Sequence, residues 1–308
     1  MQIKITDAHH GRILRYFLQK ELHLSTKMIK HLKFLEDGIL VNGARVTVRY
    51  VLQVGDLLSL AVEDEESAPI KPVDLPIEIL YEDDDLVVPA KPADMPTHPS
   101  HDHYEDTVAN ALAYRYAQSG VPFVFRPINR LDRNTSGLLL IARNRMAAGR
   151  LTESMQKGRI KKRYLAILDG EMTESDGVID KPLHRTAESI ILREVCSPDA
   201  PDAAPSRTEY TVLATGGGHT LVEARPITGR THQLRVHFAS IGHPITADDL
   251  YGTPSPYLNR HALHAYRLDF PHPADGARIL SLTAPLPADL LALLERYFKG
   301  SLLPDSLT

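Results

Sequence analysis

Cysteine and tryptophan are nearly absent from this chain, whose 308 residues include one cysteine, no tryptophan and 6% aromatic residues. A single cysteine cannot form an internal disulfide, which excludes a disulfide-rich scaffold and predicts a reducing, cytoplasmic location. The longest apolar runs, such as residues 138–142, are far shorter than the roughly 18 residues of a membrane helix. The first residues carry charge and lack the apolar core of a secretory signal, so we expect neither membrane insertion nor secretion.

The composition is that of a globular protein, with 43% hydrophobic and 24% charged residues. A chain of this length predicts a small domain beside a larger one, because single cores stop growing near about 250–300 residues. The net charge is −4, but residues 1–60 carry +4, residues 61–85 carry −9 and residues 126–163 carry +9. Two basic regions favour a polyanionic ligand; ordinary solvated faces are the alternative.

The first sixty residues predict a compact module of two helices, a hairpin and a strand. Apolar residues recur at helical spacing over residues 13–22 and 28–35, and Ser25 is a suitable N-cap for the second helix. Asn42 and Gly43 are typical of a two-residue turn between extended segments. Basic side chains on the two helices give the module its positive charge.

This module resembles the S4 RNA-binding domain, which implies a domain boundary near residue 62. The residues that carry the resemblance are Arg12 to Leu18, Lys27 to Leu35, and the run GILVNG at residues 38–43. Phosphate contacts supply affinity and register without reading sequence. The resemblance implies such contacts for Arg12, Arg15, Lys27, Lys30 and Lys33.

Residues 63–76 are acidic and contain three prolines, which predicts an extended linker. From residue 77 onward the pattern is rich in strands, two of which surround an acidic turn at residues 83–85. Residues 107–118 predict a helix, and the three consecutive glycines at 216–218 predict a hairpin turn rather than a phosphate-binding loop.

The most informative segment is residues 126–144, where the single carboxylate Asp132 lies among four arginines and directly precedes a turn and an apolar strand. Neighbouring cations favour the ionised form of a carboxylate, which can then act as a nucleophile or a base. The same pattern also fits a structural salt bridge, and composition does not distinguish the two.

Residues 129–138 read NRLDRNTSGL and closely resemble the signature of the RluA-type pseudouridine synthases, in which His-Arg-Leu-Asp is followed after two residues by Thr-Ser-Gly. Two further blocks resemble the same family in the same order, GRTHQLRVH at residues 229–237 and LHA at residues 263–265. The sequence departs from the family at three positions, where the family has His, Asn and Gly: Asn129, Pro89 and Asp94.

The resemblance implies an α+β fold in which residues 77–300 form a mixed, largely antiparallel catalytic domain with a central cleft. It implies that Asp132 is the essential carboxylate, that Arg230 is its salt-bridge partner and that Tyr164 stacks on the uracil with its hydroxyl near the C5 proton. Whether Asp132 attacks carbon or removes a ribose proton stays open. Considered alone, a Tyr at the start of an apolar strand is more often a core residue.

A base inside folded RNA must be extruded before an enzyme can reach it, and the resemblance implies that Arg130 helps to displace the nucleotide. The resemblance also implies substrate contacts for Arg133, Thr135, Lys162, Arg163 and Leu234.

Isomerisation of uridine to pseudouridine transfers no electrons and no phosphoryl group, so we expect neither a cofactor nor a metal. The histidines at positions 98, 101 and 103 lack the paired spacing of a closed zinc site, which favours a structural role. The implied partner is structured RNA, with ribosomal RNA favoured over transfer RNA. We expect a monomer without an obligate protein partner.

Two alternatives belong to other functional classes. A catalytically silent RNA-binding factor on the same scaffold is disfavoured because Asp132, Tyr164 and Arg230 are all present. An Asp-dependent hydrolase would need a second catalytic carboxylate, and none lies near Asp132 in the sequence.

Overall fold

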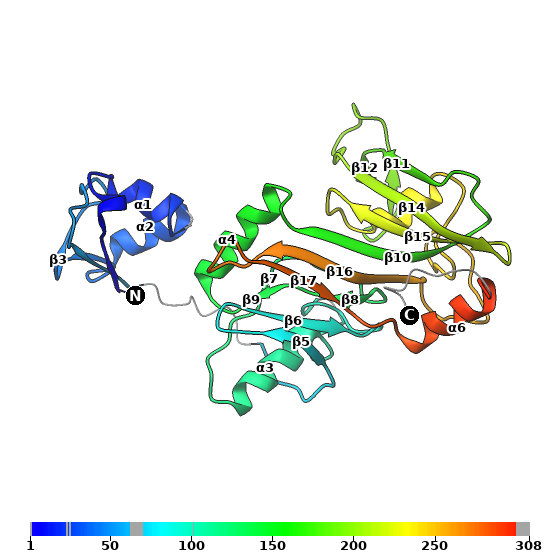
Figure 1. Cartoon of the computed structure of the whole chain (residues 1–308), viewed down its shortest axis with the longest axis horizontal. Helices are drawn as coiled ribbons and strands as arrows, with labels where there is room; N and C mark the ends of the chain where they lie inside the picture. Colours follow the sequence, from blue (N-terminus) through cyan, green and yellow to red (C-terminus); the bar gives the residue numbers. More distant parts are fainter. Residues whose placement is uncertain (1, 23, 25, 62–69, 101, 300–308) are drawn as a thin grey trace.

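A computed structural model describes residues 2–22, 24, 26–61, 70–100 and 102–299 of the chain. Its strands form a four-stranded sheet near the N-terminus, an eleven-stranded sheet and a two-stranded hairpin. Figure 1 shows the small N-terminal unit at one end of the molecule and the large sheet running through the rest of it. Among the described residues, no helix is long and apolar enough to cross a membrane.

The N-terminal unit contains the two helices, the hairpin and the strand that its sequence predicts. Its elements are β1 (Gln2–Lys4), the 3-10 helix η1 (Asp7–His9), α1 (Leu14–Lys20), α2 (Thr26–Phe34), β2 (Ile39–Val41), β3 (Ala44–Arg45) and β4 (Leu57–Leu60). Asn42 and Gly43 have φ angles of 53° and 80°, the left-handed conformations that a two-residue hairpin turn requires. The predicted N-cap Ser25 lies outside the described residues.

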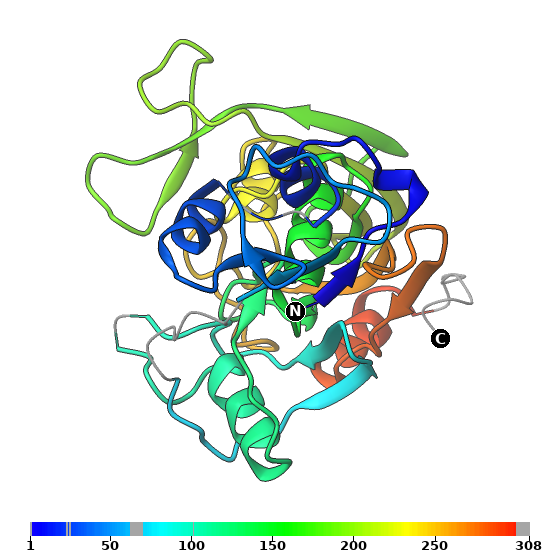
Figure 2. The same cartoon turned by 90° about the vertical axis from the view of Figure 1, so that its left-hand side faces the viewer.

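This unit has its own hydrophobic core, in which Leu14, Phe17 and Leu18 of α1 pack beneath the sheet. It also contacts the large unit through one helix. Met146 of α4 packs against the N-terminal core, and the Nη1 atom of Arg145 lies 3.2 Å from Met28 Sδ. Figure 2 shows the N-terminal unit in front of the rest of the chain.

The large unit is built around the eleven-stranded sheet, in the order β11-β14-β15-β10-β16-β8-β6-β9-β7, with β17 beside β16 and β5 beside β6. All of its strand pairs are antiparallel except β16 with β8. Its elements are β5 (Glu78–Glu82), β6 (Leu86–Lys91), α3 (Val108–Gln118), β7 (Arg126–Pro127), β8 (Ser136–Leu138), β9 (Ile141–Ala142), α4 (Arg145–Gln156), β10 (Lys161–Asp169), β11 (Asp176–Asp180), β12 (Leu183–Arg185), β13 (Arg193–Val195), β14 (Arg207–Gly216), β15 (His219–Pro226), α5 (Gln233–Ala239), β16 (Leu263–Pro271), β17 (Ile279–Thr283) and α6 (Ala288–Tyr297). The expected α+β fold with a largely antiparallel sheet is confirmed.

Apolar residues on both faces of the central strands explain why residues 86–88 and 138–142 are continuous apolar runs in the sequence. Successive strand residues point to opposite faces. Val87, Leu139 and Ile141 therefore join the core under α3 and α6. Their neighbours Leu86, Val88, Leu138, Leu140 and Ala142 join the core under α4.

Most of the predicted linker, residues 62–69, lies outside the described residues. Residues 70–77 form neither helix nor strand. They are held to α3, because the buried Asn110 side chain donates to the Lys71 carbonyl at 2.8 Å and the Asn110 carbonyl accepts from Val73 at 3.3 Å. The described end of the predicted linker is therefore attached to the large unit.

Gly137 lies where β8 and β16 come closest, and its φ angle is 116°. A Cβ atom at this position would lie 2.2 Å from the Ala265 carbonyl oxygen. We expect Gly137→Ala to lower the free energy of unfolding by more than about 3 kcal/mol, since strained backbone and a backbone clash must both be relieved.

Gly120→Ala is the matched control, because Gly120 has a φ of 65° and open space around the added methyl group. This substitution should lower the free energy of unfolding by only about 1–2 kcal/mol, because alanine is strained in the left-handed conformation. Urea unfolding of both variants tests this, and equal losses would contradict the close approach at Gly137.

Candidate active site

Asp132 lies in the loop between β7 and β8, and β8 is a central strand of the large sheet. The Thr135 amide donates to the Asp132 carbonyl at 3.1 Å, which closes a tight turn ahead of β8. The side chain of Asp132 is 29% exposed. A carboxylate held on a short turn and partly open to solvent can be reached by a ligand.

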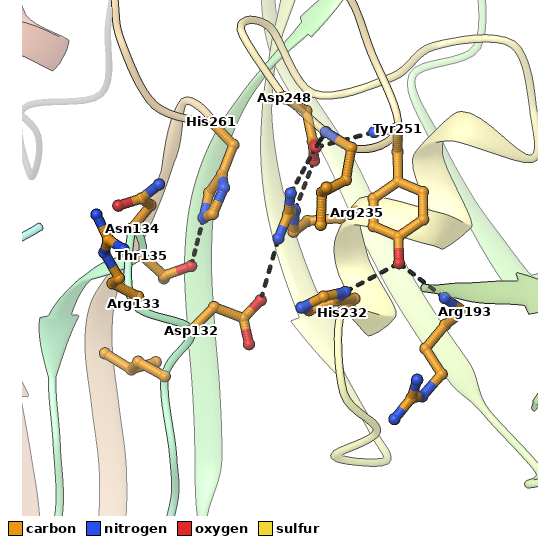
Figure 3. Close-up of polar contacts among 12 residues, drawn as sticks. Asp132, Arg133, Asn134, Thr135, Arg193, His232, Arg235, Asp248, Tyr251 and His261 are labelled. Carbon is orange, nitrogen blue, oxygen red and sulfur yellow. Dashed lines mark hydrogen bonds and ion pairs between the residues drawn. The ribbon is translucent and has the colours of Figure 1, made fainter. Parts of the chain in front are cut away.

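Arg235 of α5 lies next to this carboxylate, with its Nη1 atom 3.9 Å from Asp132 Oδ2. Its shortest hydrogen bonds are made to Asp248, since Nε and Nη2 each donate to this buried carboxylate at 2.6 Å. Nη2 also lies 3.0 Å from Asp249 Oδ1, and the guanidinium lies 5.2 Å from the centre of the Tyr251 ring. The guanidinium is therefore fixed independently of Asp132 and stabilises its negative charge from ion-pair distance (Figure 3).

The structure corrects the prediction that Arg230 pairs with Asp132. Arg230 is exposed, and its Nε donates to the Pro205 carbonyl at 3.1 Å. It lies just before α5, whereas Arg235 lies inside this helix, where it is buried. Both arginines belong to the block GRTHQLRVH. Their order along the chain does not reveal which one faces Asp132, because that depends on how α5 packs.

Tyr164 lies in β10 and is 7% exposed. A register irregularity between Arg163 and Leu165 interrupts the pairing of β10 with β16 at this residue. Burial, and then the charge of Asp132, raises the pKa of the Tyr164 hydroxyl, which therefore stays protonated. Tyr164 and Asp132 therefore lie close enough for the charge of one to act on the hydroxyl of the other.

Two histidines, one just before β16 and one within it, hold the Thr-Ser pair that follows Asp132. Thr135 Oγ1 lies 2.7 Å from His261 Nε2, and Ser136 Oγ lies 2.8 Å from His264 Nδ1. Burial lowers the pKa of His261 to about 3 and that of His264 to about 4, so both rings are neutral. Thr135 is buried, and its hydroxyl is engaged in positioning the loop.

Lys91, at the end of β6, is a supporting residue that the sequence analysis did not identify. Its buried ammonium donates to the carbonyls of Pro92, Met95 and Arg133 at 2.8, 2.8 and 2.7 Å. Burial lowers the pKa of Lys91 to about 7, and the charge of Asp132 opposes that shift. The sequence feature that could have identified Lys91 is a lysine at the end of a predicted apolar strand.

The two arginines closest to Asp132 in the sequence, Arg130 and Arg133, are both exposed. Arg133 is exposed; its Nε donates to Asp94 Oδ1 at 2.7 Å, and its Nη1 lies 3.4 Å from His103 Nε2. Asp94 has a φ of 58°, the conformation that favours glycine, and it stands where the RluA-type family has Gly. Arg130 is exposed.

The remaining predicted substrate contacts lie on β10 and α5. Lys162 is half-buried, and burial lowers its pKa. Arg163 lies between Glu223, at 3.5 Å, and Asp269, at 3.8 Å. Leu234 is buried in the core under α5.

One group of side chains in the described part of the chain has the spacing of a metal site: Asp83, Asp85 and His272. Its members already bond one another and their neighbours, since His272 Nε2 lies 2.7 Å from Asp83 Oδ2 and Asn144 donates to Asp85 at 2.8 Å.

Of the histidines at positions 98, 101 and 103, His101 lies outside the described residues. His103 is 2.5 Å from Asp106 and contacts Arg133, which accords with the structural role expected for it.

Comparison with known proteins connects this site to one enzyme family. Residues 85–240 match the family model described as RNA pseudouridylate synthase. The chain is 36% identical over 276 residues to a Bacillus subtilis (strain 168) protein named "Uncharacterized RNA pseudouridine synthase YjbO", covering 89% of this chain and 96% of that one. It is 35% identical over 281 residues to the "Ribosomal large subunit pseudouridine synthase D" of Escherichia coli O6:H1, covering 85% and 83% of the two chains.

A solved structure shares the fold. Human RNA Pseudouridylate Synthase Domain Containing 1 matches with a TM-score of 0.57 and 29% sequence identity, covering 75% of this chain and 97% of the human one. The family model spans half of the chain and includes Asp132, Tyr164 and Arg235. The chain therefore belongs to the RNA pseudouridine synthase family, as its resemblance to the RluA-type enzymes predicts, and it is an isomerase that converts uridine in RNA to pseudouridine.

Proposed function

We propose that this enzyme modifies ribosomal RNA of the large subunit and that Asp132 is the carboxylate that acts on the ribose. The observation that carries the site assignment is the partly exposed Asp132 carboxylate at ion-pair distance from the fixed guanidinium of Arg235. The choice of RNA rests on relatives named for the large ribosomal subunit, which are 35–39% identical to this chain.

The reaction breaks the bond between C1′ and N1, turns the uracil and joins C1′ to C5. The proton on C5 leaves, and N1 gains one, so the overall change is an isomerisation. Asp132 acts at the ribose, as a nucleophile at carbon or as a base for a ribose proton, and either role needs its negative charge. Arg235 holds that charge in place, and the Tyr164 ring supports the base with its hydroxyl near C5.

We also propose that the N-terminal unit is an S4-like RNA-binding domain over residues 1–62. Arg15, Lys30 and Lys33 are exposed on its helices, where their charges can contact phosphates of the RNA. Arg12 forms an ion pair with Glu21 on the same surface. The side chain of Lys27 lies outside the described residues.

Replacing Arg15, Lys30 and Lys33 together by Ala should weaken RNA binding and make it less dependent on salt. Each phosphate contact releases counterions, so losing three should reduce the slope of log affinity against log salt by about two. Lys299→Ala, which removes an exposed cation just beyond α6, is the control and should leave the slope unchanged. Filter binding over a range of salt concentrations measures both, and an unchanged slope in the triple variant would refute the contact.

Mapping pseudouridines across total RNA, with and without this gene, tests the substrate. We expect at least one large-subunit ribosomal uridine to lose its modification when the gene is absent. A site lost only from transfer RNA would replace the proposed substrate. No lost site would favour a catalytically silent RNA-binding factor.

The remaining parts of the proposal are that the enzyme acts as a monomer, without an obligate partner, in the cytoplasm.

A further inference from the structure

Tyr251 connects three parts of the Asp132 site (Figure 3). Its hydroxyl oxygen accepts a hydrogen bond from the backbone amide of Arg193, at the start of β13, at 2.9 Å. The same oxygen lies 2.9 Å from Nδ1 of His232. Its ring lies against the Arg235 guanidinium, 5.2 Å from the ring centre. None of these contacts entered the prediction of the site from sequence.

The hydrogen bonds of Tyr251 favour one position for the proton of His232. A tyrosine hydroxyl carries one proton. Because its oxygen already accepts from Arg193, that proton is free to point at His232 Nδ1, which then accepts it. A neutral imidazole with Nδ1 as acceptor carries its own proton on Nε2. Burial lowers the pKa of His232, which agrees with a neutral ring.

The backbone holds this ring in one place. His232 is the N-cap of α5 and has a φ of 57°, a conformation that is strained for a residue with a side chain. In Figure 3 the ring lies between the Tyr251 hydroxyl and the Asp132 carboxylate, with Nε2 on the Asp132 side. The other charged or titratable groups around it come from α5, β13, the loop after α5 and the segment before β16: Arg235, Arg193, Asp248 and His261.

We propose that His232 is a further catalytic residue, whose Nε2–H donates a hydrogen bond to the departing uracil, and that Tyr251 is the positioning residue that fixes this tautomer. As the C1′–N1 bond breaks, negative charge develops on the uracil carbonyl oxygens. A neutral N–H donor held beside Asp132 stabilises that charge without adding a proton-transfer step. This inference rests on the proposed role of Asp132 at the ribose.

The tautomer can be measured without any substrate. Nitrogen-15 NMR of the histidine-labelled protein distinguishes an unprotonated Nδ1 from an unprotonated Nε2, and the signals of His232 are assigned by their loss in His232→Gln. We expect the Nε2-protonated tautomer in the wild type and a mixture of tautomers in Tyr251→Phe. The opposite tautomer in the wild type, or unchanged His232 signals in Tyr251→Phe, would overturn the role of Tyr251.

Activity tests the catalytic part, using total RNA with tritium at C5 of uridine from cells that lack the gene. Tritium release under single turnover should fall about a hundredfold in His232→Asn, the loss typical of removing one donor from developing negative charge. His232→Gln keeps an N–H near the Nε2 position, so its rate should stay within about tenfold of the wild type. The enzyme concentration that gives half the maximal rate should change little.

Tyr251→Phe should lower the same rate about tenfold, the cost of one lost hydrogen bond. The same change in the His232→Gln background should have no further effect, because an amide has no tautomer to fix. The control is Tyr257→Phe, which removes the hydroxyl from an exposed ring under Arg296 and should leave the rate unchanged. Thermal unfolding of every variant excludes loss of fold as the cause.

A rate for His232→Asn close to that of the wild type would overturn the catalytic role. An equal loss from Tyr251→Phe in both backgrounds would overturn the route through His232. If Asp132→Asn still forms product, the proposed function fails instead, and the NMR result stands apart from it.

Discussion

Asp132→Asn should abolish pseudouridine formation while RNA affinity stays within a few-fold of the wild type. The substitution keeps the shape of the side chain but removes the negative charge, without which it can neither attack carbon nor take a ribose proton. Removing an essential catalytic group lowers rates by at least about a thousandfold. Tritium release from C5-labelled RNA measures the rate, and filter binding measures the affinity.

Asp94→Asn is the matched control for this experiment. Asp94 is an exposed carboxylate paired with Arg133, the residue next to Asp132, and its side chain is 72% exposed. Exposed ion pairs contribute about 1 kcal/mol or less, so this variant should remain active. Product formation by Asp132→Asn at a rate close to that of Asp94→Asn would eliminate the proposed mechanism.

Arg235→Gln should reduce both stability and activity by large amounts. Asp248 is buried and receives two hydrogen bonds from Arg235. Removing the arginine leaves a buried carboxylate without its cation, which should lower the free energy of unfolding by about 3–5 kcal/mol. The same change removes the cation beside Asp132, so tritium release should fall as well. Urea unfolding and the tritium assay measure the two effects.

The loss of stability should depend on pH. Burial by itself raises the pKa of Asp248, but several smaller effects, led by the hydrogen bonds and the charge of Arg235, together outweigh burial and hold that pKa below its usual value. A carboxyl with a lowered pKa in the folded state stabilises the protein above its ordinary pKa, and this contribution disappears on acidification. The difference between the wild type and Arg235→Gln should therefore be smaller near pH 3 than near pH 7.

Two further variants separate the roles of Arg235. Arg230→Gln changes an exposed arginine of the same block and should alter stability by no more than about 0.5 kcal/mol. Adding Asp248→Asn to Arg235→Gln removes the stranded charge and should recover part of the stability but not the activity. Recovery of full activity in this double variant would show that Arg235 acts only on the fold.

Local patterns in the sequence were sufficient for many of the elements. The helix at residues 107–118 was predicted because apolar residues recur at helical spacing, and the structure shows it as α3, with Thr107 as its N-cap. The hairpin at Asn42 and Gly43 was predicted because few residues accept two consecutive left-handed conformations. Both signals depend on neighbours along the chain.

No such local pattern in the sequence predicts helix α5. Every residue from Gln233 to Phe238 is buried, including three charged or polar side chains, Gln233, Arg235 and His237, whose hydrogen-bond partners lie far away in the sequence. A helix buried on all sides has no polar face, and its apolar spacing is lost. The expectation that Arg230 rather than Arg235 faces Asp132 failed for the same reason.

The sequence by itself determined the family and proposed Asp132 and Tyr164 as site residues, because both lie in short motifs that can be identified without knowledge of the fold. Only the tertiary structure decided that Arg235 is the cation beside Asp132, that Lys91 and His261 support its loop, and that Tyr251 reaches His232. These contacts join residues up to 126 positions apart. Their geometry depends on how α5 and the strands pack, and one-dimensional spacing does not contain that information.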